Sequence, residues 1–589
     1  MSLEATPTEN RLPPRGGDFA TLAEALDYAA EGETGYNFYT GRGELYAVLP
    51  YADLRRDAQR IARQFLCLGL CQGTRVALVA ETNPDFLRFF FACQYAGLVP
   101  VPLPVPINLG SHRAYVRQLR DMLISCQADV IIAPGGLVPF AREAAEELRP
   151  RFVGDPQTFA ELPESQRPLC QPNPDDVAYL QYTSGSTRFP RGVMITQRTV
   201  MSNLWSIIND GVKIGPGDRC VSWLPYYHDM GLVGLILTPV ASQMSVDYLG
   251  TREFAMRPRQ WLSLLSRSRA TISFSPPFGY ELCARRLRSE EADKFDLSRW
   301  RVAGVGAETI RPESLARFAE ALAPSGFDPR AFLACYGMAE CSLAVSFAPL
   351  DQGVGIDTVD GDHLAATEEV RPVSPDTAGI RINRFVDCGE PLPSFECQIR
   401  NDAGEELPER HSGVIFVRGP SVMSGYFNDP ENTREVLAAD GWLNTGDIGY
   451  RVGRRLFITG RKKDLIIING RNIWPQDLEY LAEQQPEVRP GDALAFAAPG
   501  PDGEDTTILV VQCREADKNR RAELAERLQK LIREDVGIDC YIDLVPLHTL
   551  PRTSSGKLSR SKARQNFIES HDWQRHLLAS QTRIDRRAS

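Results

Sequence analysis

Residues 181–196, QYTSGSTRFPRGVMIT, place a polar and basic loop between two runs that favour buried strand. Glycine, serine and threonine leave backbone N–H groups unencumbered and add hydroxyl donors, which together form an anion-binding concavity. Arg188 and Arg191 add positive charge that would hold a polyphosphate. A plain surface turn between two strands is the alternative, but the density of hydroxyls beside two arginines favours phosphate binding.

Short apolar runs alternate with amphipathic helical patterns on both sides of this loop. The runs at 75–81, 128–134, 178–184, 220–225, 270–277 and 300–308 predict strands, and 53–69, 83–97, 112–126 and 257–267 predict helices. Near-continuous apolar strands separated by helices predict mostly parallel sheets covered by helices on both faces. The sequence therefore predicts an α/β fold.

Composition narrows the class of protein. The 589 residues, 43% apolar and 24% charged, suit an ordinary globular protein of two or three domains. A net charge of −10 argues against binding to nucleic acid or to an anionic membrane surface. The N-terminal residues predict no signal peptide, and no apolar run is long enough to span a bilayer.

The cysteines and histidines give no metal-binding pattern. The 13 cysteines include no CxxC pair, and the 7 histidines form no HExxH. A transition-metal site is therefore not expected, and free cysteines predict a reducing cytoplasm.

The pattern changes in two places along the chain. Residues 354–385 show no apolar period, and we expect this segment to contribute little to either domain's core. After residue 455 short strands and helices return closely spaced, with helices at 475–485 and 519–534, which predicts a compact C-terminal α+β unit.

Five further segments carry polar or charged residues where the chain leaves apolar strands or turns on glycine. They are WLPYYHDMGL (223–232), LACYGMAEC (333–341), GWLNTGDIG (441–449), ITGRKKDLIIINGRNIWPQDLE (458–479) and LPRTSSGKLSR (550–560). In this order the segments resemble the adenylate-forming superfamily, which comprises acyl-CoA ligases, luciferases and the adenylation domains of peptide synthetases. The resemblance covers roughly residues 20–565.

The resemblance implies a division of the chain and a set of ligands. It implies a large N-terminal domain over residues 1–460 that binds ATP and the acyl group. Residues 461–464 would be a hinge, and residues 465–589 a small mobile C-terminal domain that carries the catalytic lysine. ATP and Mg²⁺ are the implied cofactors.

The resemblance also implies roles for individual residues. The loop residues Thr183, Ser184, Gly185, Ser186, Thr187 and Arg191 would hold the ATP phosphates. Glu340, together with Thr183, would bind Mg²⁺, and His228 would lie beside the acyl carboxylate. Adenine and ribose would contact Gly306, Ala307, Glu308, Tyr336, Gly337, Met338, Asp447 and Arg461. Lys557 would bridge the carboxylate and the α-phosphate, and Lys463 would be the hinge residue.

Within the superfamily the chain is most similar to the fatty acyl-AMP ligases. The segments WLPYYHDMGL and NGRNIWPQDLE match patterns of that branch, and the long stretch between Glu340 and Gly389 leaves room for its inserted segment at about 354–385. The resemblance implies activation of a fatty acid as acyl-adenylate, followed by transfer to the phosphopantetheine thiol of an acyl carrier protein. The inserted segment would restrain the small domain and disfavour coenzyme A.

Some positions depart from the superfamily pattern. Arg188 stands where glycine is usual and Arg191 where lysine is usual, Cys335 replaces a polar adenine contact, and SPPFGYELC (275–283) replaces an Ala-Pro-Asn segment. Two alternatives stay open: a ligase that uses coenzyme A as acceptor, and an inactive nucleotide- or acyl-binding regulator. The presence of Glu340, Asp447 and Lys557 argues against the regulator.

Overall fold

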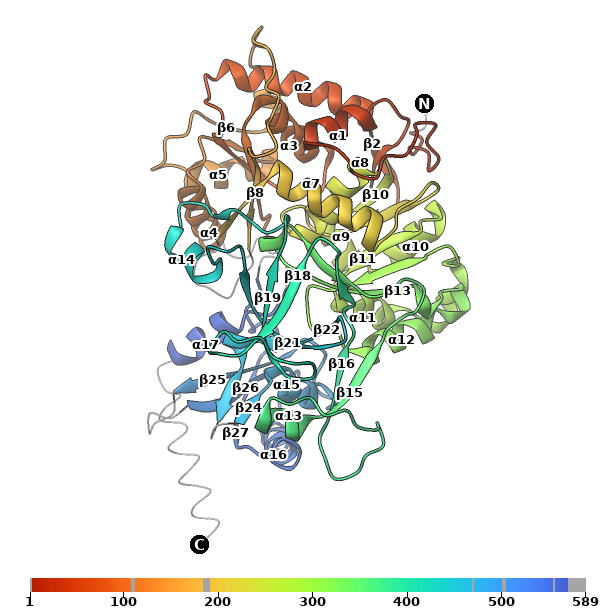
Figure 1. Cartoon of the computed structure of the whole chain (residues 1–589), viewed down its shortest axis with the longest axis vertical. Coiled ribbons are helices and arrows are strands. Elements are labelled where there is room, and N and C mark those ends of the chain that lie inside the picture. The colour runs from red at the N-terminus through yellow and green to blue at the C-terminus, as the bar shows by residue number, and fades with distance from the viewer. Residues whose placement is uncertain are drawn as a thin grey trace.

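The computed structural model describes residues 3–106, 112–183, 191–468, 471–499, 505–553 and 557–569 (Figure 1). Four predicted phosphate-loop residues, Ser184, Gly185, Ser186 and Thr187, lie outside these ranges. The chain forms mixed α/β structure with a large N-terminal part and a smaller C-terminal part, as the sequence predicts. In the described ranges, no helix combines the length and the apolar character needed to cross a bilayer.

A nine-stranded sheet forms the centre of the large part. Its order is β17 (Glu390–Pro391), β14 (Ala344–Phe347), β13 (Phe332–Gly337), β12 (Val302–Val305), β11 (Ile272–Ser275), β9 (Arg219–Ser222), β10 (Ser245–Leu249), β1 (Gly35–Tyr39) and β2 (Leu45–Pro50). From β13 to β1 neighbouring strands run parallel, and the strands at both edges are antiparallel. The parallel strands are almost wholly buried, which accounts for their continuous apolar runs.

A second, all-parallel sheet packs at the N-terminal end of the large part. Its order is β4 (Val99–Leu103), β3 (Arg75–Val79), β5 (Val130–Ile132) and β6 (Phe152–Gly154), accompanied by α2 (Tyr51–Cys67), α3 (Pro84–Ala96), α4 (His112–Cys126) and α5 (Val138–Ala144). Helix α3 begins where Asn83 accepts hydrogen bonds from two backbone N–H groups, and it ends at Gly97 with φ +67°. These caps explain why the predicted helix at 83–97 ends where it does.

Antiparallel strands complete the large part. One sheet contains β18 (Glu396–Arg400), β19 (Gly413–Arg418), β21 (Leu443–Val452) and β22 (Arg455–Arg461), and another contains β20 (Gly425–Tyr426), β8 (Gly192–Thr196) and β7 (Val177–Tyr182). Strands β7 and β8 pair as an antiparallel hairpin, so the opening loop joins two neighbouring strands. The prediction of parallel sheets holds for the centre of the fold, and this hairpin is an exception to it.

The C-terminal part has cores of its own. It contains β23 (Ile466–Ile468), β24 (Arg471–Ile473), α15 (Pro475–Glu483), β25 (Ala493–Pro499), β26 (Asp505–Gln512), α16 (Lys518–Asp535), β27 (Cys540–Val545) and α17 (Arg560–Glu569). Two buried apolar clusters draw only on residues from 466 onward. We propose on this basis that the domain boundary and hinge lie at 461–464.

The expectation that 354–385 contributes little to either core is wrong. This segment forms β15 (Ile356–Asp360), α13 (Gly361–Thr367) and the start of β16 (Ile382–Val386), and α13 contacts β24 of the C-terminal part (Figure 1). Val359, Leu364, Ala365 and Val370 are buried in one cluster with Tyr450, Phe457 and Trp474. The apolar residues come from a strand, a short helix and a loop in turn, so no single period runs through the segment.

Candidate active site

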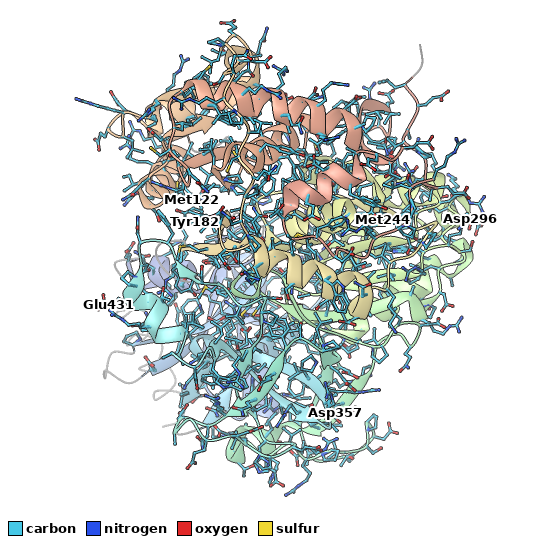
Figure 2. The ribbon with its side chains drawn as sticks, turned by 45° about the horizontal axis from the view of Figure 1, so that its top comes forward. Met122, Tyr182, Met244, Asp296, Asp357 and Glu431 are labelled. Carbon is cyan, nitrogen blue, oxygen red and sulfur yellow. The ribbon has the colours of Figure 1, made fainter. Side chains whose placement is uncertain are left out.

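A cleft of about 1370 Å³ lies where the central sheet, the antiparallel sheets and the C-terminal part meet. Met122 and Tyr182 line it on one side and Met244 on another (Figure 2). It brings together most of the residues predicted from the sequence: Thr183, Arg191, His228, Ala307, Tyr336, Gly337, Met338, Glu340, Arg461, Lys463 and Lys557. Gly306, Glu308 and Asp447 adjoin these lining residues in the chain or by direct contact.

Parallel strands place several of these residues at one edge of the central sheet. His228 follows β9, Ala307 follows β12 and Glu340 follows β13, so all three lie beyond the carboxyl ends of parallel strands of the same sheet. The backbone there is tightly packed, because a Cβ on Gly337 would lie 1.9 Å from the carbonyl oxygen of Leu343. Ala307 itself has φ +69°, a strained value for a residue with a side chain.

Asp447 joins two of the predicted nucleotide contacts. Its Oδ2 accepts a hydrogen bond of 2.8 Å from the Tyr336 hydroxyl, and its Oδ1 lies 2.9 Å from Arg461 Nε. Asp447 on β21 and Arg461 on β22 are register partners, so the strand pairing itself sets this ion pair. Burial raises the pKa of Tyr336, and the Asp447 charge raises it further, so the phenol stays protonated.

Glu340 bonds to Tyr426, a residue that the sequence motifs do not indicate. The Tyr426 hydroxyl donates to Glu340 Oε1 at 2.8 Å, and the Arg191 guanidinium lies 5.2 Å from the centre of the Tyr426 ring. Arg191 also donates to Asn432. Burial raises the pKa of Glu340, although the Tyr426 hydrogen bond opposes the shift.

The donor set at Glu340 suits one kind of metal. In the described part of the chain, no group of three histidine, cysteine or acidic side chains could enclose an ion. A carboxylate such as Glu340 suits Mg²⁺, which takes one or two protein carboxylates and completes its shell with phosphate oxygens and water.

Lys557 reaches the cleft from the C-terminal part. Its Nζ donates a hydrogen bond of 2.8 Å to the carbonyl oxygen of Ala307. Burial lowers the pKa of Lys557, while the nearby carboxylates of Glu308 and Asp229 oppose that shift. The predicted catalytic lysine and the predicted adenine-binding backbone therefore meet in the same place.

The other predicted residues lie as follows. The side chain of His228 is 17% exposed, and its Nδ1 lies 2.6 Å from Asp229 Oδ1. Lys463 lies in a short 3-10 turn, η8 (Lys462–Asp464), between β22 and the C-terminal part, where the hinge is expected. The backbone N–H of Thr183 donates to the carbonyl oxygen of Arg191, which closes the described base of the phosphate loop.

Comparisons with known proteins identify the family to which the chain belongs. The family model described as AMP-binding enzyme matches residues 29–427. A Caulobacter vibrioides protein provisionally named an acyl-CoA synthetase is 47% identical, over 96% of this chain and 98% of its own. A medium-chain fatty acid–acyl-carrier-protein ligase of Moorena producens is 32% identical, over 94% of this chain and 96% of its own. A solved structure from a study of fatty acyl-adenylate ligases from E. coli and L. pneumophila is 49% identical with a TM-score of 0.91, and covers 95% of this chain and 100% of its own.

Proposed function

Because the chain belongs to the family of AMP-binding enzymes, and within it to the fatty acyl-AMP ligases, we propose that it activates a medium- or long-chain fatty acid and passes the acyl group to the phosphopantetheine thiol of an acyl carrier protein. One observation carries the proposal: a single cleft is lined by Lys557, Glu340 and His228 and also by several apolar side chains. ATP and Mg²⁺ are the cofactors.

In the first step a carboxylate oxygen of the acid forms a bond to the α-phosphorus of ATP, and the bond to pyrophosphate breaks. The carboxylate and the triphosphate repel each other, so the protein has to hold both and neutralise the charge that builds on the α-phosphate. Lys557 supplies a positive charge at the meeting point, while Asp447 and Arg461 would hold the ribose and phosphate. Glu340 would hold Mg²⁺, which when bound would supply positive charge beside the leaving pyrophosphate.

The apolar residues of the cleft lining suit an alkyl chain. They include Ile207, Leu235, Met244, Ile272, Leu343 and Phe347. Burying each methylene of a chain in such surroundings stabilises binding by about 0.8 kcal/mol. A fatty acid would therefore lie with its carboxylate at His228 and its tail against these apolar residues.

Transfer in the second step needs a thiol carrier. The carrier's sulfur forms a bond to the acyl carbon, AMP leaves, and the thiol proton is lost. Arg113 and Arg117 project from one face of α4 at the rim of the cleft, and no carboxylate in the described part of the chain lies within ion-pairing distance of them. Two unpaired cations support a partner whose phosphopantetheine arm, and whose surface around it, is negatively charged.

Coenzyme A is the competing acceptor, and the name of the Caulobacter relative favours it. The inserted segment supports the carrier protein instead, because it ties the C-terminal part to the large part. Arg381 lies 2.5 Å from Asp477 of α15, and the Asn383 amide donates to the same carboxylate at 3.4 Å. Such contacts favour the arrangement in which Lys557 is in the cleft over a second orientation that coenzyme A would need.

Intact-protein mass spectrometry of the acceptor tests the proposal. The enzyme is given ATP, Mg²⁺, a fatty acid, and either a carrier with its phosphopantetheine arm, a carrier without it, or coenzyme A. We expect acyl mass on the armed carrier only. Efficient acyl-CoA formation with no acyl-carrier would contradict the assignment of the acceptor.

Charge reversal separates docking from activation. Arg113→Glu together with Arg117→Glu should raise the KM for the carrier about tenfold, while acid-dependent pyrophosphate release stays unchanged. Arg252→Glu, an exposed arginine on α9 (Thr251–Met256), is the matched control. An unchanged KM in the double variant would rule out this docking surface.

A further inference from the structure

An ion pair joins the end of α15 in the C-terminal part to the start of α12 (Pro312–Leu322) in the large part. Arg311 donates a hydrogen bond to the carboxylate of Glu483, and its guanidinium lies 5.5 Å from the centre of the Tyr480 ring. The side chains of Arg311 and Glu483 are 27% and 4% exposed. Removing one partner of such a pair is costly, because the other charge is left buried without compensation.

Glu483 is also connected to the segment that carries Lys557. Its Oε1 accepts a hydrogen bond of 2.7 Å from the Gly491 N–H, and Arg552 donates to the Gly491 carbonyl oxygen at 2.8 Å. Arg552 and Leu558 form a β-bridge on either side of Lys557. Two hydrogen bonds and this bridge therefore connect the carboxylate of Glu483 to the lysine segment.

The contacts close a ring through the loop that joins β12 to α12. Lys557 bonds to the carbonyl oxygen of Ala307 near one end of this loop, and Arg311 is the residue at its other end. The same loop carries the predicted adenine contacts. The C-terminal part therefore holds the loop at two points, through Lys557 and through Glu483.

We propose that Arg311 and Glu483 are a positioning pair that sets the orientation of the C-terminal part in which Lys557 lies in the cleft. The inference rests on the proposed function, since it concerns the first of its two steps. Neither Arg311 nor Glu483 lines the cleft, so the pair would act through Lys557 and not on a ligand. Removing the pair raises the free energy of this orientation relative to others, so the share of molecules with Lys557 in place should fall.

The neighbouring charges cannot take over the role of Arg311. Arg560, the next arginine at this interface, donates two hydrogen bonds of 2.8 Å to Glu479. Among the described residues, no cation other than Arg311 lies within ion-pairing distance of Glu483. Loss of Arg311 therefore leaves Glu483 without a counter-charge.

Arg311→Gln tests the inference by measuring the two steps separately. We expect kcat for acid-dependent pyrophosphate release to fall about 10- to 100-fold, the size of effect that coupled neighbouring side chains show. The KM values for ATP and for the acid should change little, because the pair touches neither ligand. Transfer of the acyl group from supplied acyl-adenylate to the carrier should keep its wild-type rate, since that step forms no bond to phosphorus.

A double-mutant cycle and a control separate this role from a general loss of stability. Arg311→Gln and Glu483→Gln remove the same interaction, so the double variant should release pyrophosphate no more slowly than the slower single variant. Arg301→Gln breaks a half-buried pair with Asp218 inside the large part, and it should lower the melting temperature without changing pyrophosphate release. Fully additive losses in the double variant, or equal slowing of both steps, would overturn the inference.

A substrate-free readout keeps this test independent of the proposed function. Fluorescent labels at Arg252→Cys on α9 and Lys530→Cys on α16, two exposed positions, report the distance between the two parts by energy transfer. The exposed Cys67 and Cys71 are changed to serine in this protein. The distribution of energy transfer should be narrow with Arg311 present and broader in Arg311→Gln. Identical distributions would contradict the role of the pair, whereas failure of every acid in the activity assay would contradict only the proposed function.

Discussion

The two walls of the cleft are built differently. On the large part, each functional side chain already has a partner: Tyr336 and Arg461 bond to Asp447, Tyr426 to Glu340, and Asp229 to His228. On the C-terminal part, Lys557 reaches across and bonds to a backbone carbonyl, that of Ala307. If the proposed function is right, the large part provides a pre-formed binding surface, and the C-terminal part adds the positive charge that adenylation needs.

Removing Lys557 should have the largest effect on activity, because it takes away that charge and leaves the other wall intact. We expect Lys557→Ala to slow acid-dependent pyrophosphate release by at least about 10²-fold, the cost of losing one transition-state charge contact. The melting temperature should stay unchanged, since the side chain is at the cleft surface. Lys530→Ala, an exposed lysine on α16, is the control, and similar losses in both variants would contradict the comparison.

Removing Asp447 should damage the pre-formed wall. Asp447→Ala leaves Tyr336 and Arg461 without their acceptor, and it removes a charged partner for the ribose. Charge-assisted hydrogen bonds contribute about 1.5–3 kcal/mol, so the KM for ATP should rise about 10- to 100-fold. Because the Asp447 residue is only 5% exposed, the variant should also melt at a lower temperature. The control is Asp402→Ala, which removes the exposed carboxylate that pairs with Lys462. It should change neither the KM for ATP nor the melting temperature.

The inserted segment joins the two walls, so a core change there should affect stability first. Leu364→Ala should cost about 2–5 kcal/mol of unfolding free energy if the cluster with Tyr450 and Trp474 is cooperative with the rest of the protein. Ile356→Ala, at a position 38% exposed in the same segment, should cost far less. Equal and small losses of unfolding free energy in the two variants, measured by chemical denaturation, would show that the segment lies outside the core.

Glu340→Gln should give the smallest change in stability, and it should be stabilising. Burial raises the folded-state pKa of Glu340, so between the unfolded and folded pKa values the folded protein binds more protons. Stability contributed by this group is thus fully present below the unfolded pKa and falls as pH rises through the folded value. Glutamine does not ionise and so removes that loss, and the gain in melting temperature should appear only above the unfolded pKa of Glu340. The Mg²⁺ concentration needed for activity should rise in the same variant. A gain that is equal at all pH values would contradict this account.

Much of the fold could be predicted because its central strands are buried on both faces and read as continuous apolar runs. The helices predicted at 83–97 and 112–126 agree with α3 and α4 to within a residue or so at each end. The capping residues Asn83 and Gly97 indicate the two ends of α3, and apolar periodicity indicates the extent of α4. The inserted segment could not be predicted. Its four apolar residues in the buried cluster find their partners in residues far along the chain, and local sequence carries no signal of such pairing.

The site, like the fold, has some parts that the sequence could predict and others that it could not. The positions of Glu340 and Lys557 in one cleft could be predicted because both stand in short polar segments that match a known order, while their roles stay predictions. Tyr426 could not, because nothing near residue 426 indicates that its hydroxyl meets Glu340. Asp229 stands beside His228 in the sequence, but only the structure shows that the two side chains lie 2.6 Å apart.

The products formed from ATP, Mg²⁺ and a panel of carboxylic acids give the most direct test that the cleft is an adenylation site. Mass spectrometry of the wild-type reaction should detect the acyl-adenylate of fatty acids, with one pyrophosphate released for each adenylate formed and none without acid. Pyrophosphate release independent of acid, or release of ADP and phosphate in place of AMP and pyrophosphate, would contradict the account.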